Sequence, residues 1–311
     1  MSQTLHQGKR GSQRIAFGTV LCPLDLTLDS ERALRYAVAI AQAFEARLMV
    51  CHCLPTADGV TNSEACNHLN NAVQQYLRPT DGRLKFGWEA KVYVGNPAEA
   101  IPREAARSGV DLIVMRSRRR PHAAALLGST AESVCRTAPC PVLVTHQMER
   151  EWAGMSTNEV GLERVLVAYD FSGDSELALA YGLSLAQEYQ SELHLLHVLP
   201  PRARTDGREG TMVDSAVDDG PRTAAVKLQR VVPAEAALWC NLKQAVREGH
   251  VYREVLDYAE ERSVDLICMG ASGTGFGMRA LFGSNADRVL RQADCPVLIA
   301  RPLRPIHGGE Q

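Results

Sequence analysis

The sequence lacks the features of a membrane-spanning or secreted protein. No apolar run reaches about 18 residues, the length that a helix needs to cross a bilayer. Residues 1–14 are polar and lack the apolar centre of a signal peptide, and we expect them to form a disordered tail. The net charge is −2, so the chain has no surplus of one sign to attract nucleic acid or an anionic membrane. These absences predict a cytoplasmic protein with neither a membrane nor a nucleic-acid partner.

The cysteines indicate neither disulfides nor a metal site. Their number, 9, is odd, and several lie in apolar strand-like runs where a thiol acts as a small hydrophobic group. This usage is typical of a reducing compartment, the cytoplasm. In Cys51-His52-Cys53, alternation along a strand places the two thiols on one face and the imidazole on the other, so the three side chains cannot converge on one ion.

Two common nucleotide-binding patterns are also absent. The P-loop pattern G-x-x-x-x-G-K-[ST] does not occur in the chain. The dinucleotide pattern G-x-G-x-x-G fails because Met278 stands at the third position after Gly275. A nucleotide site in this protein must therefore be built in another way.

A different glycine-rich segment is present near the C-terminus. Met269-Gly270-Ala271-Ser272-Gly273 follows the apolar run 264–268, and Gly283-Ser284 precedes a segment with helical character. A strand, a bare turn and a helix N-terminus in this order suit phosphate, because glycines let the backbone approach and the first N–H groups of the helix point at an anion. The segment predicts a nucleotide site, with ATP as the ligand we favour; a flexible surface loop is the alternative.

The chain is a tandem repeat. Thr19–Asp25 matches Arg164–Asp170, and each is an apolar strand that ends in Asp. Asp29–Tyr36 matches Asp174–Tyr181 at a constant offset, and helical spacing of apolar residues follows in both. Each half therefore alternates between strands and helices, which predicts an α/β fold with a five-stranded parallel sheet in each domain. The expected order is a tail, a first domain, a linker, a second domain and a second tail, at residues 1–14, 15–146, 147–161, 162–303 and 304–311.

Polar and glycine residues gather at the predicted strand ends of the second half. The remaining strands are expected at Arg47–Leu54, Lys85–Val94, Asp111–Met115, Pro141–Val144, Glu192–Leu199, Leu238–Val246, Asp265–Met269 and Pro296–Ile299. Asp170, His197-Val198 and Met269-Gly270 fall at the carboxyl ends of their strands. Because parallel sheets bind ligands beyond those ends, where the strand order reverses, we expect these residues to share one rim and one ligand.

These features resemble the universal stress proteins. The likeness covers the chain from about residue 15 to about residue 301 apart from the linker, and rests on the tandem halves, the strand ending in Asp, the G-x2-G-x9-G-S spacing and the Cys-Pro pair before each last strand. It implies two flavodoxin-like or Rossmann-like domains of the adenine nucleotide α-hydrolase type. It also implies that the halves pair through their last strands as an intramolecular pseudo-dimer. A homodimer of the whole chain and a protein partner of unknown identity stay open.

The resemblance also implies a ligand and its contacts in the second half. The ligand is ATP, with or without Mg²⁺. Asp170 would hold the adenine or ribose end, and the backbone of Val198 would contact the adenine. Met269 and Gly270 would flank the ribose, and the phosphates would lie along Gly273, Gly283, Ser284 and Asn285. The implied cofactor-binding residues are Ala168, Asp170, Val198, Met269, Gly270, Gly273, Gly283, Ser284 and Asn285. Many family members have Pro at the position of Ala168.

The first half departs from this pattern. Arg116 and Arg119 stand where the second half has Gly270 and Gly273, and the loop is one residue shorter. Each Arg adds a Cβ and a long side chain where the backbone would approach a ligand, so we expect ATP in the second half only. Three interpretations of the run Arg116–Arg120 stay open: a solvated basic loop, a clamp for a polyanion, and a group that reaches the phosphates of the other half.

Three functions stay open at this stage. We favour an ATP-binding regulatory module of the stress response, because no Ser, Cys or His near the motif is paired with a general base and no second carboxylate is placed for Mg²⁺ catalysis. A slow ATPase or adenylating enzyme is the second possibility, and a nucleotide-free interaction scaffold the third. Asp25 and Asp170 also have two interpretations, ligand contact or strand-end cap; we favour the cap for Asp25 and the ligand for Asp170.

Overall fold

A computed structural model describes most of the chain. The described residues are 15–55, 59–76, 86–117, 127–146, 152–153, 161–201, 220–273 and 282–302. The two predicted tails, at 1–14 and 304–311, lie outside the described residues, and so does most of the predicted linker. No helix in the described part of the chain is long and apolar enough to cross a bilayer.

Strands and helices alternate in both halves, as the repeat predicts. The first half consists of β1 (Thr19–Pro23), α1 (Leu28–Ala43), β2 (Arg47–Leu54), α2 (Gly59–Tyr76), β3 (Trp88–Val94), α3 (Pro97–Arg107), β4 (Leu112–Arg116), α4 (Ser129–Thr137) and β5 (Val142–Thr145). The second half consists of β6 (Arg164–Ala168), α5 (Gly173–Tyr189), β7 (Glu192–Leu199), α6 (Gly220–Gln229), the 3₁₀ helix η1 (Ala234–Leu238), β8 (Leu242–Glu248), α7 (Val251–Glu261), β9 (Leu266–Gly270), α8 (Ser284–Gln292) and β10 (Val297–Ala300).

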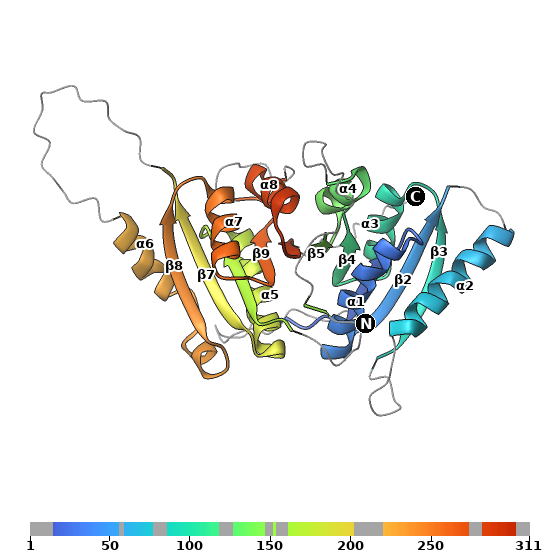
Figure 1. Ribbon diagram of the computed structural model, residues 1–311, viewed down its shortest axis with the longest axis horizontal. Helices are drawn as coiled ribbons and strands as arrows, with labels where there is room; N and C mark the ends of the chain where they lie inside the picture. The colour runs from blue at the N-terminus through green and yellow to red at the C-terminus, as the bar shows by residue number, and fades with distance from the viewer. Residues whose placement is uncertain are drawn as a thin grey trace, which may run out of the picture.

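The strands in the described residues form a 10-stranded sheet in the order β3-β2-β1-β4-β5-β10-β9-β6-β7-β8 (Figure 1). Within each half the strands are parallel, in the order of a Rossmann-like sheet. Between the halves β5 and β10 pair antiparallel, with Leu143 opposite Leu298. The predicted fold class is therefore confirmed, and the halves join through their last strands as the resemblance implies.

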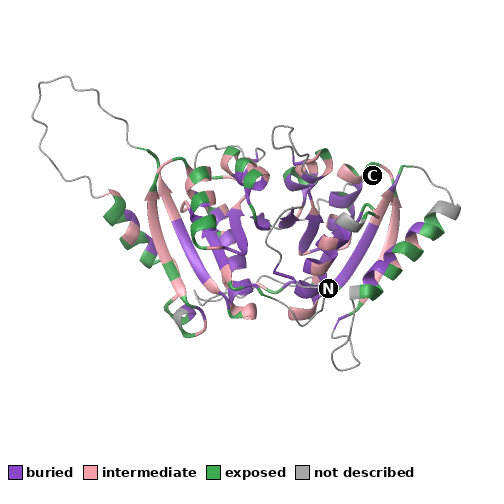
Figure 2. Ribbon diagram, in the orientation of Figure 1, coloured by how far each residue is buried: buried purple, intermediate pink, exposed green. Residues whose placement is uncertain are grey.

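Apolar side chains form two layers, one on each side of the sheet. Along β1, Val20 belongs to one layer and Leu21 to the other, and Val165 and Leu166 repeat this alternation along β6. Helices cover both faces, which is why the inner strands are apolar at consecutive positions. Figure 2 shows buried residues filling the inner strands, whereas β3 and β8 at the two edges are mostly half-buried. Each layer contains residues of both halves, so the core is continuous across the repeat.

Aromatic contacts join the halves on the α1 and α5 side. Phe17 stacks on Tyr181, with ring centroids 5.6 Å apart. Trp152 lies edge-on to Tyr36 at 4.8 Å and to Tyr189 at 5.7 Å. Trp152 belongs to the stretch predicted as a polar linker, yet it is 2% exposed. The segment between the domains thus contributes a large side chain to the core.

Several predicted strand starts are too early: β3 begins at Trp88 rather than Lys85, and the largest error is at β8. The third strand of the second half was expected from Leu238, but that residue ends the 3₁₀ helix η1 and β8 begins at Leu242. Leu242 lies opposite Leu193, next to the start of β7. Pairing with β7 begins at Asn241, whose carbonyl accepts from Leu193 N–H at 2.9 Å, whereas Ala234–Leu238 form the 3₁₀ helix.

Candidate functional site

The strand-end residues of the second half lie on one rim of the sheet. Ala168 ends β6 and lies opposite Met269 of β9. Gly270 ends β9, whereas β7 continues to Leu199 and carries Val198 beyond the end of β6. The strand order reverses between β6 and β9, the place where open α/β sheets bind ligands. The structure therefore brings these predicted site residues to the switch point of the second half.

Asp170 caps the segment that leads into α5. Its Oδ1 accepts hydrogen bonds from Ser172 N–H at 3.0 Å and from Ser172 Oγ at 2.5 Å. In the first half Asp25 Oδ1 accepts the same pair of bonds from Thr27. Asp25 thus has the capping role predicted for it, and Asp170 makes the same capping hydrogen bonds. A ligand contact by Asp170 would use Oδ2, which faces Gly273.

An aromatic cluster, which the sequence reasoning missed, lies beside Asp170. Phe171 has a left-handed backbone, with φ of 62°, and its ring lies edge-on to Tyr169 at 5.1 Å and to His197 at 4.8 Å. His197 Nδ1 donates to the Tyr169 carbonyl at 2.7 Å. Burial, followed by the nearby Glu176 and Asp170 carboxylates, raises the pKa of Tyr169 to about 12, so its phenol stays neutral. His197 is a packed strand residue, as expected, and it ties β7 to the end of β6.

Gly270 and Gly273 differ in what surrounds them. A Cβ on Gly270 would lie 2.8 Å from Asp174 Cβ and 2.9 Å from its carbonyl carbon, which is part of the α5 backbone. A Cβ on Gly273 would lie 2.6 Å from Asp170 Oδ2, the end of a side chain that can rotate. Gly270 is therefore required for β9 to pack against α5. At Gly273 no backbone atom stands in the way of a Cβ, so packing does not require a glycine there.

Asp174 fixes the middle of the glycine turn. Its Oδ2 accepts from Ser272 N–H at 3.1 Å and from Ser272 Oγ at 2.5 Å. The first turn of α5 also favours a negative charge, because the helix dipole is positive there. The repeat matches Asp174 with Asp29, but the hydrogen bond joins residues 98 positions apart, and no local pattern reveals it.

The helix after the glycine-rich loop begins without a side-chain cap. Its N-cap residue, Gly283, offers no side-chain hydrogen bond to the first turn of α8. Gly283 N–H donates to Ala271 O at 2.8 Å, which joins the two ends of the loop. Ser284 is exposed and Asn285 half-buried. The first N–H groups of α8, with the Ser284 hydroxyl beside them, suit an anion such as phosphate. Residues 274–281 lie outside the described residues.

The corresponding position of the first half carries a large side chain. Arg116 ends β4 opposite Thr145, where the second half has Gly270 opposite Ala300. Arg119 and residues 118–126 around it lie outside the described residues.

The residues present fit the nucleotide that the resemblance implies. Gly273 and Gly283 lack side chains where a Cβ would lie 2.6 Å from Asp170 Oδ2 and 3.3 Å from the Ala271 carbonyl oxygen, so side chains at these two positions would fill the space beside them. Among the described residues, no group of three or more His, Cys, Asp or Glu could hold a metal ion by itself. A Mg²⁺ that arrives with phosphates needs one or two carboxylates at most, because the phosphates and water supply the other ligands.

Comparison with known proteins decides the family. A family model described as the Universal stress protein family matches residues 16–146 and again residues 161–301. The chain belongs to the universal stress protein family. The two matches cover both halves of the repeat, so the protein is a tandem member of the family.

Two relatives and a solved structure show how far the likeness extends. Universal stress protein G of Escherichia coli O157:H7 is 34% identical over 128 residues, which are 41% of this chain and 89% of that protein. Universal stress protein YxiE of Bacillus subtilis is 30% identical over 153 residues, or 44% of this chain and 98% of that one. A universal stress protein from Archaeoglobus fulgidus has the same fold over 91% of this chain and 98% of its own, with a TM-score of 0.66 and 23% identity.

Proposed function

We propose that this universal stress protein is a nucleotide-dependent regulatory module of the stress response that binds ATP in its second half only. Two glycines without side chains, Gly273 after β9 and Gly283 at the uncapped N-terminus of α8, carry the proposal. Asp170 and Val198 border the adenine and ribose, Ala168, Met269 and Gly270 lie beneath them, and the phosphates lie along Gly273, Gly283, Ser284 and Asn285. Arg116 in place of Gly270 removes this arrangement from the first half.

One observation favours the nucleotide-free scaffold as the alternative. Gly270 is required by the packing of β9 on α5, so its presence does not by itself demand a ligand. The two functions differ in a measurement of stoichiometry by equilibrium dialysis, with and without Mg²⁺. We expect one ATP per chain. No bound ATP would favour the scaffold, and two per chain would contradict the proposed difference between the halves.

Ser284→Ala and Ser129→Ala form a matched pair of variants, because the two serines begin α8 and α4 at equivalent positions. Loss of a hydrogen bond to a charged phosphate should weaken ATP binding about tenfold in Ser284→Ala. Ser129→Ala should bind ATP as the unchanged protein does. Calorimetric titration measures both affinities, and equal effects in the two variants would contradict the assignment of the second half.

Gly273→Arg copies the residue that the first half has at this position. We expect it to abolish ATP binding while the fold persists, because the nearest atom to a new Cβ is the rotatable Asp170 carboxylate. Circular dichroism and the melting temperature check the fold, and titration checks binding. ATP binding at unchanged affinity would show that a bare turn is not what the ligand requires.

A further inference from the structure

The last turn of α4, in the first half, lies next to Phe282, which precedes α8 in the second half. In Figure 1, α4 and α8 face each other across the middle of the molecule. Arg136, near the end of α4, places its guanidinium carbon 5.7 Å from the ring centroid of Phe282. Phe282 is 8% exposed and directly precedes Gly283, whose N–H closes the loop on Ala271. A residue of the first half thus packs on the residue that anchors the phosphate loop of the second.

Side chains of the second half hold α4 in this place. Arg301, which is 6% exposed, donates from Nη1 to the Arg136 carbonyl at 2.6 Å and to the Ala138 carbonyl at 3.5 Å. These carbonyls end α4, where the helix dipole favours a cation. Arg291 of α8 bonds to Glu132 of α4 at 3.2 Å. Arg291 therefore holds the first turn of α4 and Arg301 holds its C-terminal end.

The two halves are not equivalent in this contact: the first half packs an arginine on the second, but the second half does not do the same to the first. Leu127 stands in the first half where the second half has Phe282, so an arginine of α8 has no aromatic ring to pack on there. His146 stands where the second half has Arg301, and it bonds to Ser117 of its own half at 2.8 Å. In the described residues, the first half contributes an arginine to the loop of the second, and the second returns no equivalent.

We propose that Arg136 is a positioning residue for Phe282, Gly283 and the first turn of α8, which form the phosphate end of the proposed site in the second half. The planar guanidinium over Phe282 limits the movement of Phe282 and Gly283, and hence of the first turn of α8. The first half, whose own loop carries Arg116 in place of glycine, thereby completes the site of the second. The expected change in ATP affinity rests on the proposed function, whereas the expected effect of Arg136 on the mobility of Gly283 does not.

A double-mutant cycle tests the contact. The variants are Arg136→Met, Phe282→Leu, which copies Leu127 of the first half, and the two together. We expect each single variant to weaken ATP binding about threefold to tenfold, the range of a cation–π contact, and the double variant to lose no more than either alone. Adenosine affinity should not change, because the loop lies at the phosphate end. Arg136→Lys should recover part of the loss, and Arg222→Met, at an exposed arginine of α6, serves as a control.

Hydrogen exchange of the ligand-free protein separates this inference from the proposed function. The Gly283 amide should exchange faster in Arg136→Met than in the unchanged protein, whether or not ATP binds. If the unchanged chain binds no ATP, the proposed function fails and the exchange result alone decides the inference. Unchanged Gly283 exchange in Arg136→Met would overturn the inference. An equal loss of ATP and adenosine affinity would overturn it too, since that pattern indicates general destabilisation.

Discussion

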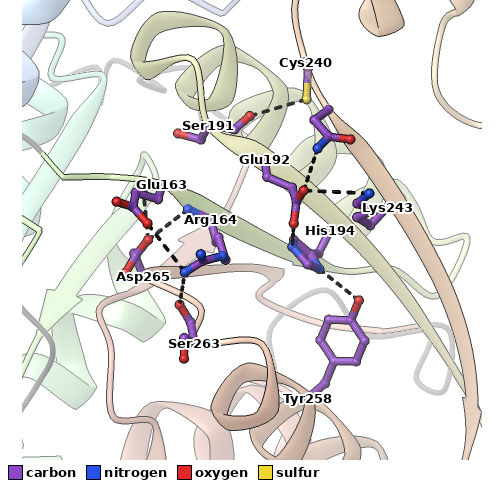
Figure 3. Close-up of polar contacts among 11 residues, drawn as sticks. Glu163, Arg164, Ser191, Glu192, His194, Cys240, Lys243, Tyr258, Ser263 and Asp265 are labelled. Atoms are coloured by element: carbon purple, nitrogen blue, oxygen red, sulfur yellow. Dashed lines mark hydrogen bonds and ion pairs between the residues drawn. The ribbon is translucent and has the colours of Figure 1, made fainter.

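Asp265 lies at the start of β9, where its carboxylate joins two neighbouring strands. Its Oδ2 accepts from the N–H groups of Glu163 and Arg164 at the start of β6 (Figure 3). Asp111 makes the same pair of bonds in the first half. In both halves the fourth strand begins one residue later than predicted, at the residue after this Asp.

His194 occupies a position where the halves differ. It is buried on β7, where Nδ1 accepts from the Tyr258 hydroxyl at 2.9 Å and Nε2 donates to Glu192 at 2.7 Å (Figure 3). Burial lowers the pKa of His194 from its usual value of 6.5, and the Glu192 carboxylate opposes this only in part. Met49 takes the equivalent place on β2 and cannot titrate.

The lowered pKa of His194 predicts a loss of stability in mild acid. As the pH falls through 6.5, the unfolded chain binds a proton before the folded protein does, so the free energy of unfolding falls with the pH. His194→Met removes the group that binds this proton and introduces the residue that the first half has at this position. We expect a smaller fall in melting temperature between about pH 7.5 and about pH 5.5 than in the unchanged protein. An equal fall would contradict the assignment to His194.

Helix α5 packs so closely on β6 that the helix residue facing the strand, Gly182, has no room for a side chain. Gly182 lies in the middle of α5, where glycine usually costs about 1 kcal/mol relative to alanine. A Cβ on Gly182 would lie 2.6 Å from Val167 Cγ2. In the first half the corresponding pair is Ala37 and Cys22, both fully buried. In the second half the larger strand residue, Val167, thus packs against the smaller helix residue, Gly182.

Gly182→Ala should destabilise the protein although it improves helix propensity. Overpacking against Val167 is expected to cost about 1–3 kcal/mol, which exceeds the gain from propensity. Val167→Cys in the same chain copies the first half and should restore most of the loss. Denaturant unfolding midpoints of the two variants measure this. A Gly182→Ala protein more stable than the unchanged one would show that the helix can move away from the strand at little cost.

Both halves form one structural unit at the scale of the molecule. The sheet is continuous through β5 and β10, and the core layer on the α1 and α5 side contains residues of both halves. Trp152 lies in that layer between Tyr36 of α1 and Tyr189 of α5. Neither half can unfold without exposing part of the core of the other.

A single cooperative unfolding transition follows from this continuity. Calorimetry should show one transition whose calorimetric and van't Hoff enthalpies agree. Trp152→Ala should cost about 3–5 kcal/mol, the usual effect of removing a buried Trp, and should shift that one transition downward. Two separated transitions in either protein would show that the halves fold independently, and Trp88→Ala in the edge strand β3 serves as a less buried control.

Local patterns in the sequence determined the repeat, the alternation of strands and helices, and the rim on which the site lies. Asp170 and Gly270 come at the ends of apolar runs, and parallel strands bring their carboxyl ends to one edge, so their proximity follows from periodicity. The boundaries that patterns missed, such as the start of β8, depend on where a neighbouring strand offers a partner. The ligand roles of the site residues stay predictions.

The tertiary structure decided the contacts that give individual residues their tasks. Asp174 holds Ser272 across 98 positions, and Arg301 reaches the end of α4 across 165. Trp152 lies in the core although its segment of the sequence is polar. Gly270 must be a glycine because α5 packs against it, and not because of the turn that follows it. Such contacts have no period along the chain, because they depend on which elements the folded sheet places side by side.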